Sequence, residues 1–175
     1  MIRSTIYGVA LGTIFLSSGS FATPVTNPTF TPQSSHVSSD TVYIAAFNSD
    51  TAALEQSVFN QINNYRVSQK LAKLTRNSAI DNQARIHSQD MAKGKVPIGH
   101  TGFLERVKAI GISYKTAGEN VAYNYGYSDP ATIAVQGWLK SPGHLANIIG
   151  NYEKTGIGVA KNSRGEIYLT QLFLR

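Results

Sequence analysis

The order of two hydrophobic patterns along the chain constrains its fold more than any other feature. Apolar residues recur at intervals of three and four from Leu54 to Tyr65, which is the period of one helix face. Near the C-terminus, the apolar segments 156–160 and 166–173 flank the turn-forming sequence 162–165, which predicts an antiparallel hairpin. Because helices come first and strands last, without the alternation typical of a parallel sheet, the sequence predicts an α+β fold.

Three further helices are predicted between these two ends. One begins after Asn77, a good N-cap residue, and ends near Gly94. A short helix follows the loop 97–102 and ends at Gly111. The pair Asp129-Pro130 combines a capping side chain with a proline at the first helical position, so it predicts the start of another helix.

The first 49 residues are predicted to lie outside the folded domain, which comprises residues 50–175. Residues 1–22 contain Arg3, the apolar stretch 6–16 and small residues ending at Ala22, the three-part pattern of a secretory signal peptide. The apolar stretch is too short for a membrane-spanning helix, which needs about 20 residues. Residues 23–49 are rich in Pro, Ser and Thr and predict a flexible tether.

Charge and cysteine content exclude several classes of function. The chain has 16 Lys and Arg against 10 Asp and Glu, a net charge of +6 that favours anionic surfaces. No four basic residues are consecutive, so we expect no nucleic-acid partner. The chain has no cysteine, which excludes a disulfide framework, a thiolate nucleophile and cysteine-ligated zinc. We expect a monomer with no transmembrane span after signal cleavage.

Three ionisable residues stand close to glycines, in predicted loops or at helix ends: His100, Glu119 and His144. In such positions a side chain can reach a cleft. Two imidazoles and one carboxylate could bind a zinc ion and leave one position open for water. They could equally form a hydrogen-bonded network that only fixes the loops. Their separations match no compact metal motif, and both interpretations stay open. His87, on the inner face of a predicted helix, is predicted to be a structural core residue.

Five segments resemble, in order, the motifs of the CAP superfamily (cysteine-rich secretory proteins, antigen 5 and pathogenesis-related proteins, or SCP domains). The resemblance covers about residues 53–174 and fits the cysteine-free bacterial type. Several motifs in one order are far more specific than any one of them. The segments are 58–66, Gly99–Arg106, Gly118–Ala122, Trp138–Ile149 and 156–173.

The resemblance implies a three-layer α-β-α sandwich around a small antiparallel sheet, with a cleft lined by His100, Glu119 and His144. In eukaryotic members a second glutamate lies three residues after the conserved tryptophan, but Ser141 stands there in this chain. The missing carboxylate weakens both a metal site and a hydrolytic mechanism. Leu145 stands where bacterial relatives often have arginine.

These observations favour a secreted, non-enzymatic binding module of the cell envelope or extracellular space. Its cleft would bind a small ligand, lipid, glycan or other envelope component and would require no cofactor. The alternative is a zinc-dependent hydrolase of an envelope polymer or peptide. In that case His100 and His144 would hold the ion, and Glu119 would be a ligand or the catalytic base. A structural or protein-interaction role is a third hypothesis. Periplasm, cell wall and outside medium are all consistent with a signal peptide.

Overall fold

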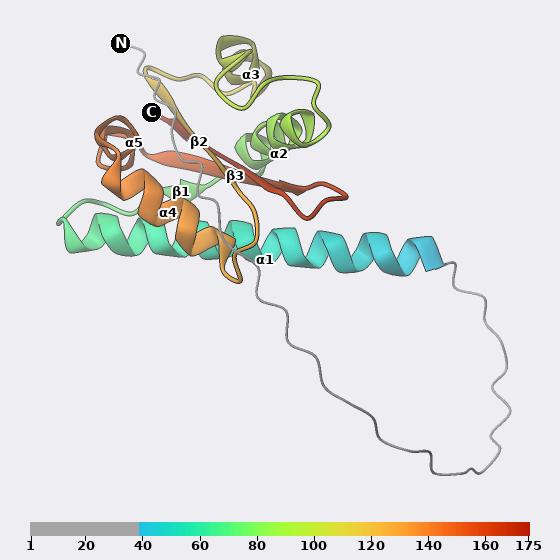
Figure 1. The fold of residues 1–175 in the computed structure, drawn as a ribbon. Coiled ribbons are helices and arrows are strands. Elements are labelled where there is room, and N and C mark those ends of the chain that lie inside the picture. Colours follow the sequence, from blue (N-terminus) through green and yellow to red (C-terminus); the bar gives the residue numbers. More distant parts are fainter. Residues whose placement is uncertain (1–38) are drawn as a thin grey trace, which may run out of the picture.

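The computed structural model describes the backbone of residues 39–175 and the side chains from Asp50 onward. The predicted signal peptide and residues 23–38 of the predicted tether lie outside the described residues. The predicted hairpin comes last in the described part, but two further strands, at 75–76 and 117–124, lie between the helices (Figure 1). The elements are α1 (Ser39–Ser68), β1 (Thr75–Arg76), α2 (Ser78–Ala92), α3 (Phe103–Ala109), β2 (Ala117–Asn124), α4 (Pro130–Lys140), α5 (Pro142–Ile148), β3 (Lys154–Lys161) and β4 (Ile167–Leu174).

The described strands form one sheet in the order β1-β3-β4-β2. The predicted hairpin is confirmed, since β3 and β4 pair antiparallel with Gly158 opposite Thr170. β2 pairs antiparallel with β4, and its other side is an edge of the sheet. β1 pairs parallel with β3 over two residues only, so most of the outer side of β3 has no neighbouring strand.

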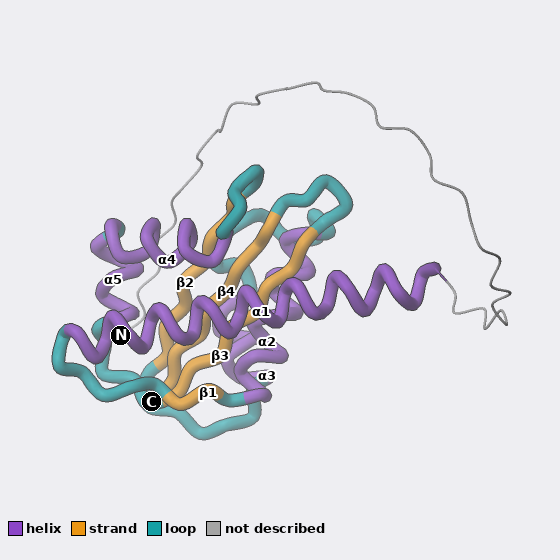
Figure 2. Tube along the Cα trace, turned by 90° about the horizontal axis from the view of Figure 1, so that it is seen from below, coloured by secondary structure: helices purple, strands orange, loops and turns teal. Residues whose placement is uncertain are grey.

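Helices cover both faces of this sheet, as the two views show (Figures 1 and 2). α2 and α3 lie on one face. Ile80 of α2 and Val107 of α3 belong there to the same hydrophobic cluster as Leu172 of β4. α1, α4 and α5 lie on the other, where Trp138 and Phe173 are fully buried. Burial of these apolar faces against the sheet is the main stabilising term of the fold. The chain therefore adopts the expected three-layer α-β-α sandwich.

Two glycines of β3 allow α2 to lie directly on the sheet. A Cβ atom at Gly156 would collide with the backbone of Ile80 and Asp81, and one at Gly158 with the backbone of Ala84 and Arg85. The Gly-x-Gly spacing follows from the two-residue period of a strand, which points both positions toward the same face. This close contact fixes the position of α2, and with it His87, relative to the sheet.

The first helix begins earlier than the sequence predicts. α1 starts at Ser39 rather than at Asp50, so the part of the predicted tether from 39 to 49 is helical. Residues 42–47 contain neither proline nor glycine. A helix already formed over 50–68 can therefore extend through them at little cost, because propagation is easier than nucleation. None of the helices in the described part of the chain combines the length and apolar character that crossing a bilayer requires.

Candidate functional site

Glu119 is the centre of a buried ionic cluster on the α2/α3 side of the sheet. It lies on β2 opposite Leu172 and is 1% exposed. Arg106 of α3 binds it with two groups, since Nε donates to Oε2 at 2.8 Å and Nη2 donates to Oε1 at 3.0 Å. A two-point guanidinium–carboxylate contact is both strong and directional. The pair therefore fixes α3 against the edge strand.

His100 is the third member of this cluster. Its Nδ1 lies 2.9 Å from Oε1 of Glu119, so the ring N–H donates to the carboxylate. The loop that carries His100 is held from both sides. Arg106 donates to the carbonyl of Thr101 at 3.2 Å, and His87 Nε2 lies 2.7 Å from the carbonyl oxygen of Gly99. The side chain of His100 keeps an exposed fraction of 10%, against 2% for that of Glu119.

The prediction that His87 is a core residue of α2 is confirmed. It is 2% exposed, and its ring donates a hydrogen bond to the Gly99 carbonyl, which satisfies the buried nitrogen. Burial lowers the pKa of His87, and the nearby positive charge of Arg106 lowers it further. The attraction of Glu119 only partly opposes this shift. His87 is therefore neutral at pH 7 and supports the loop that carries His100.

His144 lies in the first turn of α5 and is completely buried. The side-chain nitrogen of Asn120 donates to the backbone carbonyl of His144 at 3.2 Å. Asn147, one turn later, donates to the carbonyl of Glu119 at 3.0 Å and to the side chain of Asn120 at 2.9 Å. The structure thus joins His100 and Glu119 directly. It attaches the helix that carries His144 to the strand at Glu119 and Asn120.

Two other residues of the sequence motifs complete the free edge of β2. The indole nitrogen of Trp138 donates to the carbonyl of Val121 at 3.1 Å, while Asn147 bonds the carbonyl of Glu119 two residues earlier. These side chains replace hydrogen bonds that a neighbouring strand would supply. Trp138 and Asn147 therefore have structural roles.

Arg106 is the residue to which sequence reasoning assigned no role. Arg106 is the last residue of the motif segment Gly99–Arg106, and no other motif in the sequence singles it out. The signal that could have identified it is helical spacing. An arginine one turn after a helix start can reach back to the preceding loop, as Arg106 does to Thr101.

The arrangement does not fit a zinc centre built from His100, Glu119 and His144. Both oxygens of Glu119 accept hydrogen bonds from Arg106, whose permanent positive charge opposes a neighbouring cation. Among the residues with described side chains, no group of three or more His, Asp or Glu lies close enough to hold a metal ion. A zinc site needs at least three protein ligands.

A cavity of about 250 Å³ between α2 and α3 reaches the cluster from outside. Its lining includes His87, Arg106, Asp90, Glu105 and the half-exposed Ile86. The cavity lining therefore combines apolar, acidic and basic groups, and Arg106 is the member of the ionic cluster that lines it. A small organic ligand is the kind of molecule that such a mixed lining can accept.

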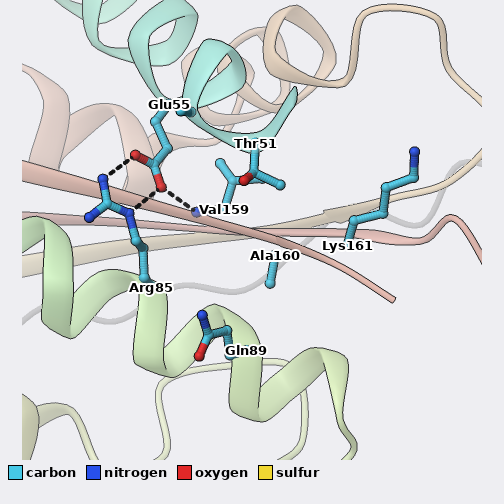
Figure 3. Close-up of a pocket in the computed structure, with 8 residues that line it drawn as sticks. Thr51, Glu55, Arg85, Gln89, Val159, Ala160 and Lys161 are labelled. Atoms are coloured by element: carbon cyan, nitrogen blue, oxygen red, sulfur yellow. Dashed lines mark hydrogen bonds and ion pairs between the residues drawn. The ribbon is translucent and has the colours of Figure 1, made fainter. Parts of the chain in front are cut away.

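A larger cavity of about 390 Å³ lies between α1, α2 and the end of β3 (Figure 3). Its buried charge is Glu55, which accepts from Arg85 Nε at 2.7 Å and from Nη2 at 2.6 Å. Glu55 also accepts from Arg76 at 2.8 Å and from the backbone N–H of Val159 at 3.3 Å. Asp81 likewise accepts from the N–H of Ile157 at 2.8 Å. These carboxylates cover the strandless edge of β3.

The chain belongs to the CAP family, because the family described as "Cysteine-rich secretory protein family" matches residues 59–173. Two Bacillus subtilis (strain 168) proteins are similar to it. YkwD is 37% identical over 131 residues, which cover 72% of this chain and 49% of YkwD. YlbC, described as a membrane protein, is 32% identical over 126 residues, which cover 69% of this chain and 34% of YlbC. The chain thus spans about half or a third of these relatives.

Solved structures show the same fold. An extracellular SCP-domain protein of Bacillus anthracis has a TM-score of 0.63 at 26% identity, covering 81% of this chain and 45% of that one. An outer surface protein of Borrelia burgdorferi has a TM-score of 0.63 at 20% identity, covering 70% and 92%. The chain is thus a CAP/SCP domain of the cysteine-free bacterial type.

Proposed function

We propose that this chain is a secreted, non-enzymatic binding module that holds a small ligand, lipid or glycan of the cell envelope beside His100. The main support for this proposal is the way in which the Glu119 carboxylate is hydrogen-bonded. Its carboxylate is paired at two points with Arg106, so it is not free to take a proton from water or to bind a metal ion. A buried pair of this kind makes a rigid wall, which suits recognition.

His100 is the member of the predicted site best placed to touch a ligand. The exposed side-chain fractions are 10% for His100 and 2% for Glu119, and His144 is fully buried. In this proposal Glu119 orients the imidazole and Arg106 holds Glu119. His144 and α5 keep the edge strand in place. The likeness to extracellular and surface proteins supports an extracytoplasmic location.

The test is a search for the ligand on protein recovered from the culture or envelope of its own host. Native mass spectrometry identifies a mass that co-purifies with the wild type. His100→Ala is expected to reduce the bound fraction at least about tenfold, which corresponds to the loss of one strong contact. Lys108→Gln, a change of an exposed residue of α3 that does not line the cavity, is the matched control and keeps the ligand. Equal occupancy in both variants would refute the role of His100.

The zinc-hydrolase alternative predicts a different response to metal. A protein that binds zinc at 100 times its Kd gains about 2.7 kcal/mol of stability by mass action. For a binding module without a metal, we expect the same melting temperature with zinc chloride, with a chelator and with neither. Calorimetric titration with zinc chloride checks this on the wild type and on His100→Ala. A stoichiometric heat that disappears in the variant would favour the hydrolase.

A further inference from the structure

Most of the excess positive charge of this domain lies at one end of the sheet. Here α1 ends, β1 and β3 begin, and β4 reaches the C-terminus (Figures 1 and 2). Backbone hydrogen bonds join the chain segments at this end. Thr75 donates to Glu153, Glu153 to Leu174, and Thr116 to Arg175. The loops 69–74, 111–116 and 149–153 therefore meet at one surface, which we call the basic end.

The basic end carries five cations and one acidic side chain, Glu153. The cations are Lys70, Lys73, Lys115, Lys154 and Arg175. Arg175 lies 3.5 Å from Glu153, with both side chains largely exposed, so water and salt screen this pair. All five cations except the half-buried Lys154 are exposed.

Elsewhere in the part with described side chains, most acidic groups have a cationic partner. Arg76 and Arg85 pair with Glu55, and Arg106 pairs with Glu119. At the hairpin end, the contacts are Lys161 with Asp50 and Arg164 with Glu166. The net charge of +6 is thus unevenly spread, and the basic end is where an anionic surface would be attracted most strongly.

Exposed apolar side chains stand among these cations. Val67 is 50% exposed, Ile149 is 44% exposed and Tyr114 is 38% exposed. Arg66 connects the chain segments that carry the first two. It precedes Val67 and donates to the carbonyls of Ile148 and Gly150, which flank Ile149. Tyr114 precedes Lys115, whose backbone N–H donates to the carbonyl of Arg175. Each of the three loops therefore contributes an exposed apolar residue or begins within two residues of one, and each lies close in sequence to a cation.

We propose that the basic end is a membrane-docking surface that binds a bilayer rich in anionic phospholipid. Lysines near a bilayer surface are attracted to anionic headgroups, while short apolar tips can enter the headgroup region. A soluble polyanion would use the cations alone and would leave the three apolar tips in water. This surface is separate from the cluster around Glu119, so the inference does not rest on the proposed ligand site.

The test compares two triple variants of the chain without the predicted signal peptide, residues 1–22. Their binding is measured by co-sedimentation with vesicles of phosphatidylglycerol and phosphatidylcholine. Lys70→Glu with Lys73→Glu and Lys115→Glu changes the basic end. Lys93→Glu with Lys95→Glu and Lys161→Glu makes the same change of net charge at the hairpin end. Every variant shares the same N-terminal residues, so their contribution cancels. We expect the first variant to bind at least about tenfold more weakly and the second to change less than about threefold.

A second readout follows the apolar tips. Ile149→Trp introduces an indole at the surface, while the one native tryptophan, Trp138, is 1% exposed and gives a constant background. The emission of the introduced indole should shift to the blue with anionic vesicles and stay unchanged with soluble polyphosphate. Glu119→Gln should bind vesicles like the wild type, whatever happens to the ligand site.

Three results would overturn the docking surface. The two triple variants could lose affinity equally, which would mean that net charge alone attracts the protein. The introduced indole could remain in water on the vesicles. Polyphosphate could bind as tightly as the vesicles, which would assign the surface to a soluble or polymeric anion.

Discussion

Two edges of the sheet contain buried carboxylates paired with arginines, but the carboxylates have different partners. At the β3 edge, Glu55 and Asp81 accept backbone N–H groups of Val159 and Ile157. At the β2 edge, the hydrogen bonds of the Glu119 carboxylate come from the side chains of Arg106 and His100. The first cluster completes the sheet, whereas the second holds a loop with a partly exposed imidazole.

This difference shows why burial and arginine pairing do not by themselves indicate a functional site. The carboxylates of both clusters are almost fully buried, and the larger cavity lies beside Glu55. Glu55 is nevertheless committed to the N–H group of Val159, which must have an acceptor for the sheet edge to be stable. The β2 edge solves the same problem with neutral side chains, Trp138 and Asn147. Glu119 is therefore available for another role.

The largest expected effect is at the β3 edge. Glu55→Ala should lower the free energy of unfolding by about 3 kcal/mol, because it leaves one buried strand N–H without its acceptor and removes the common partner of two partly exposed arginines. Denaturant unfolding followed by circular dichroism measures this. Glu153→Ala, which removes an exposed carboxylate, is the control and should change stability by less than about 0.5 kcal/mol. A small effect of Glu55→Ala would mean that water can replace the carboxylate at this edge.

Replacing whole ion pairs sharpens the comparison further. The double change Glu119→Met with Arg106→Met should cost only about 1–2 kcal/mol, for the lost bonds to Thr101 and His100, because apolar residues can replace a buried pair. The double change Glu55→Met with Arg85→Met should cost more, since the Val159 N–H and Arg76 still lose a partner. The same unfolding assay compares them. Equal losses would show that the two clusters are energetically equivalent.

The sequence predicts the secondary structure and the family well because these depend on local patterns. Asn77 caps α2 as expected, and Asp129 with Pro130 starts α4. The order of motifs also predicts the three-layer sandwich. The predicted start of α1 was wrong. The composition of residues 23–49 suggested a tether, but residues 42–47 contain no proline or glycine, so the helix can extend through them.

The candidate site could be predicted only in part. His100 and Glu119 do meet, yet the residue that determines the state of Glu119 is Arg106. The β3 edge cluster could not be predicted, because Glu55 and Val159 are brought together only by the packing of α1 on the sheet. Local patterns do not report such long-range contacts.

The smallest expected effect is on the pH dependence of the free energy of unfolding. It distinguishes the two edges because a histidine contributes at the β2 side. The β3 cluster consists of carboxylates and arginines, whereas His87 supports the loop at the β2 side. Burial lowers the pKa of His87 in the folded chain below its ordinary value of 6.5. As the pH falls below 6.5, the unfolded chain therefore binds a proton more readily than the folded one. The contribution of His87 to stability is fully present above pH 6.5 and is lost as the pH falls through the lower, folded-state pKa.

His87→Gln tests this, because the glutamine amide can still donate to the Gly99 carbonyl but does not titrate. Between pH 8 and pH 5, the wild type should lose stability relative to the variant, while His100, present in both proteins, cancels in the comparison. Unfolding at several pH values, with the pKa of His87 measured by NMR, gives both quantities. Parallel stability curves, or an NMR pKa at or above 6.5, would mean that the imidazole is more solvated than its 2% exposure indicates. The loop that carries His100 would then be less firmly supported than the β3 edge.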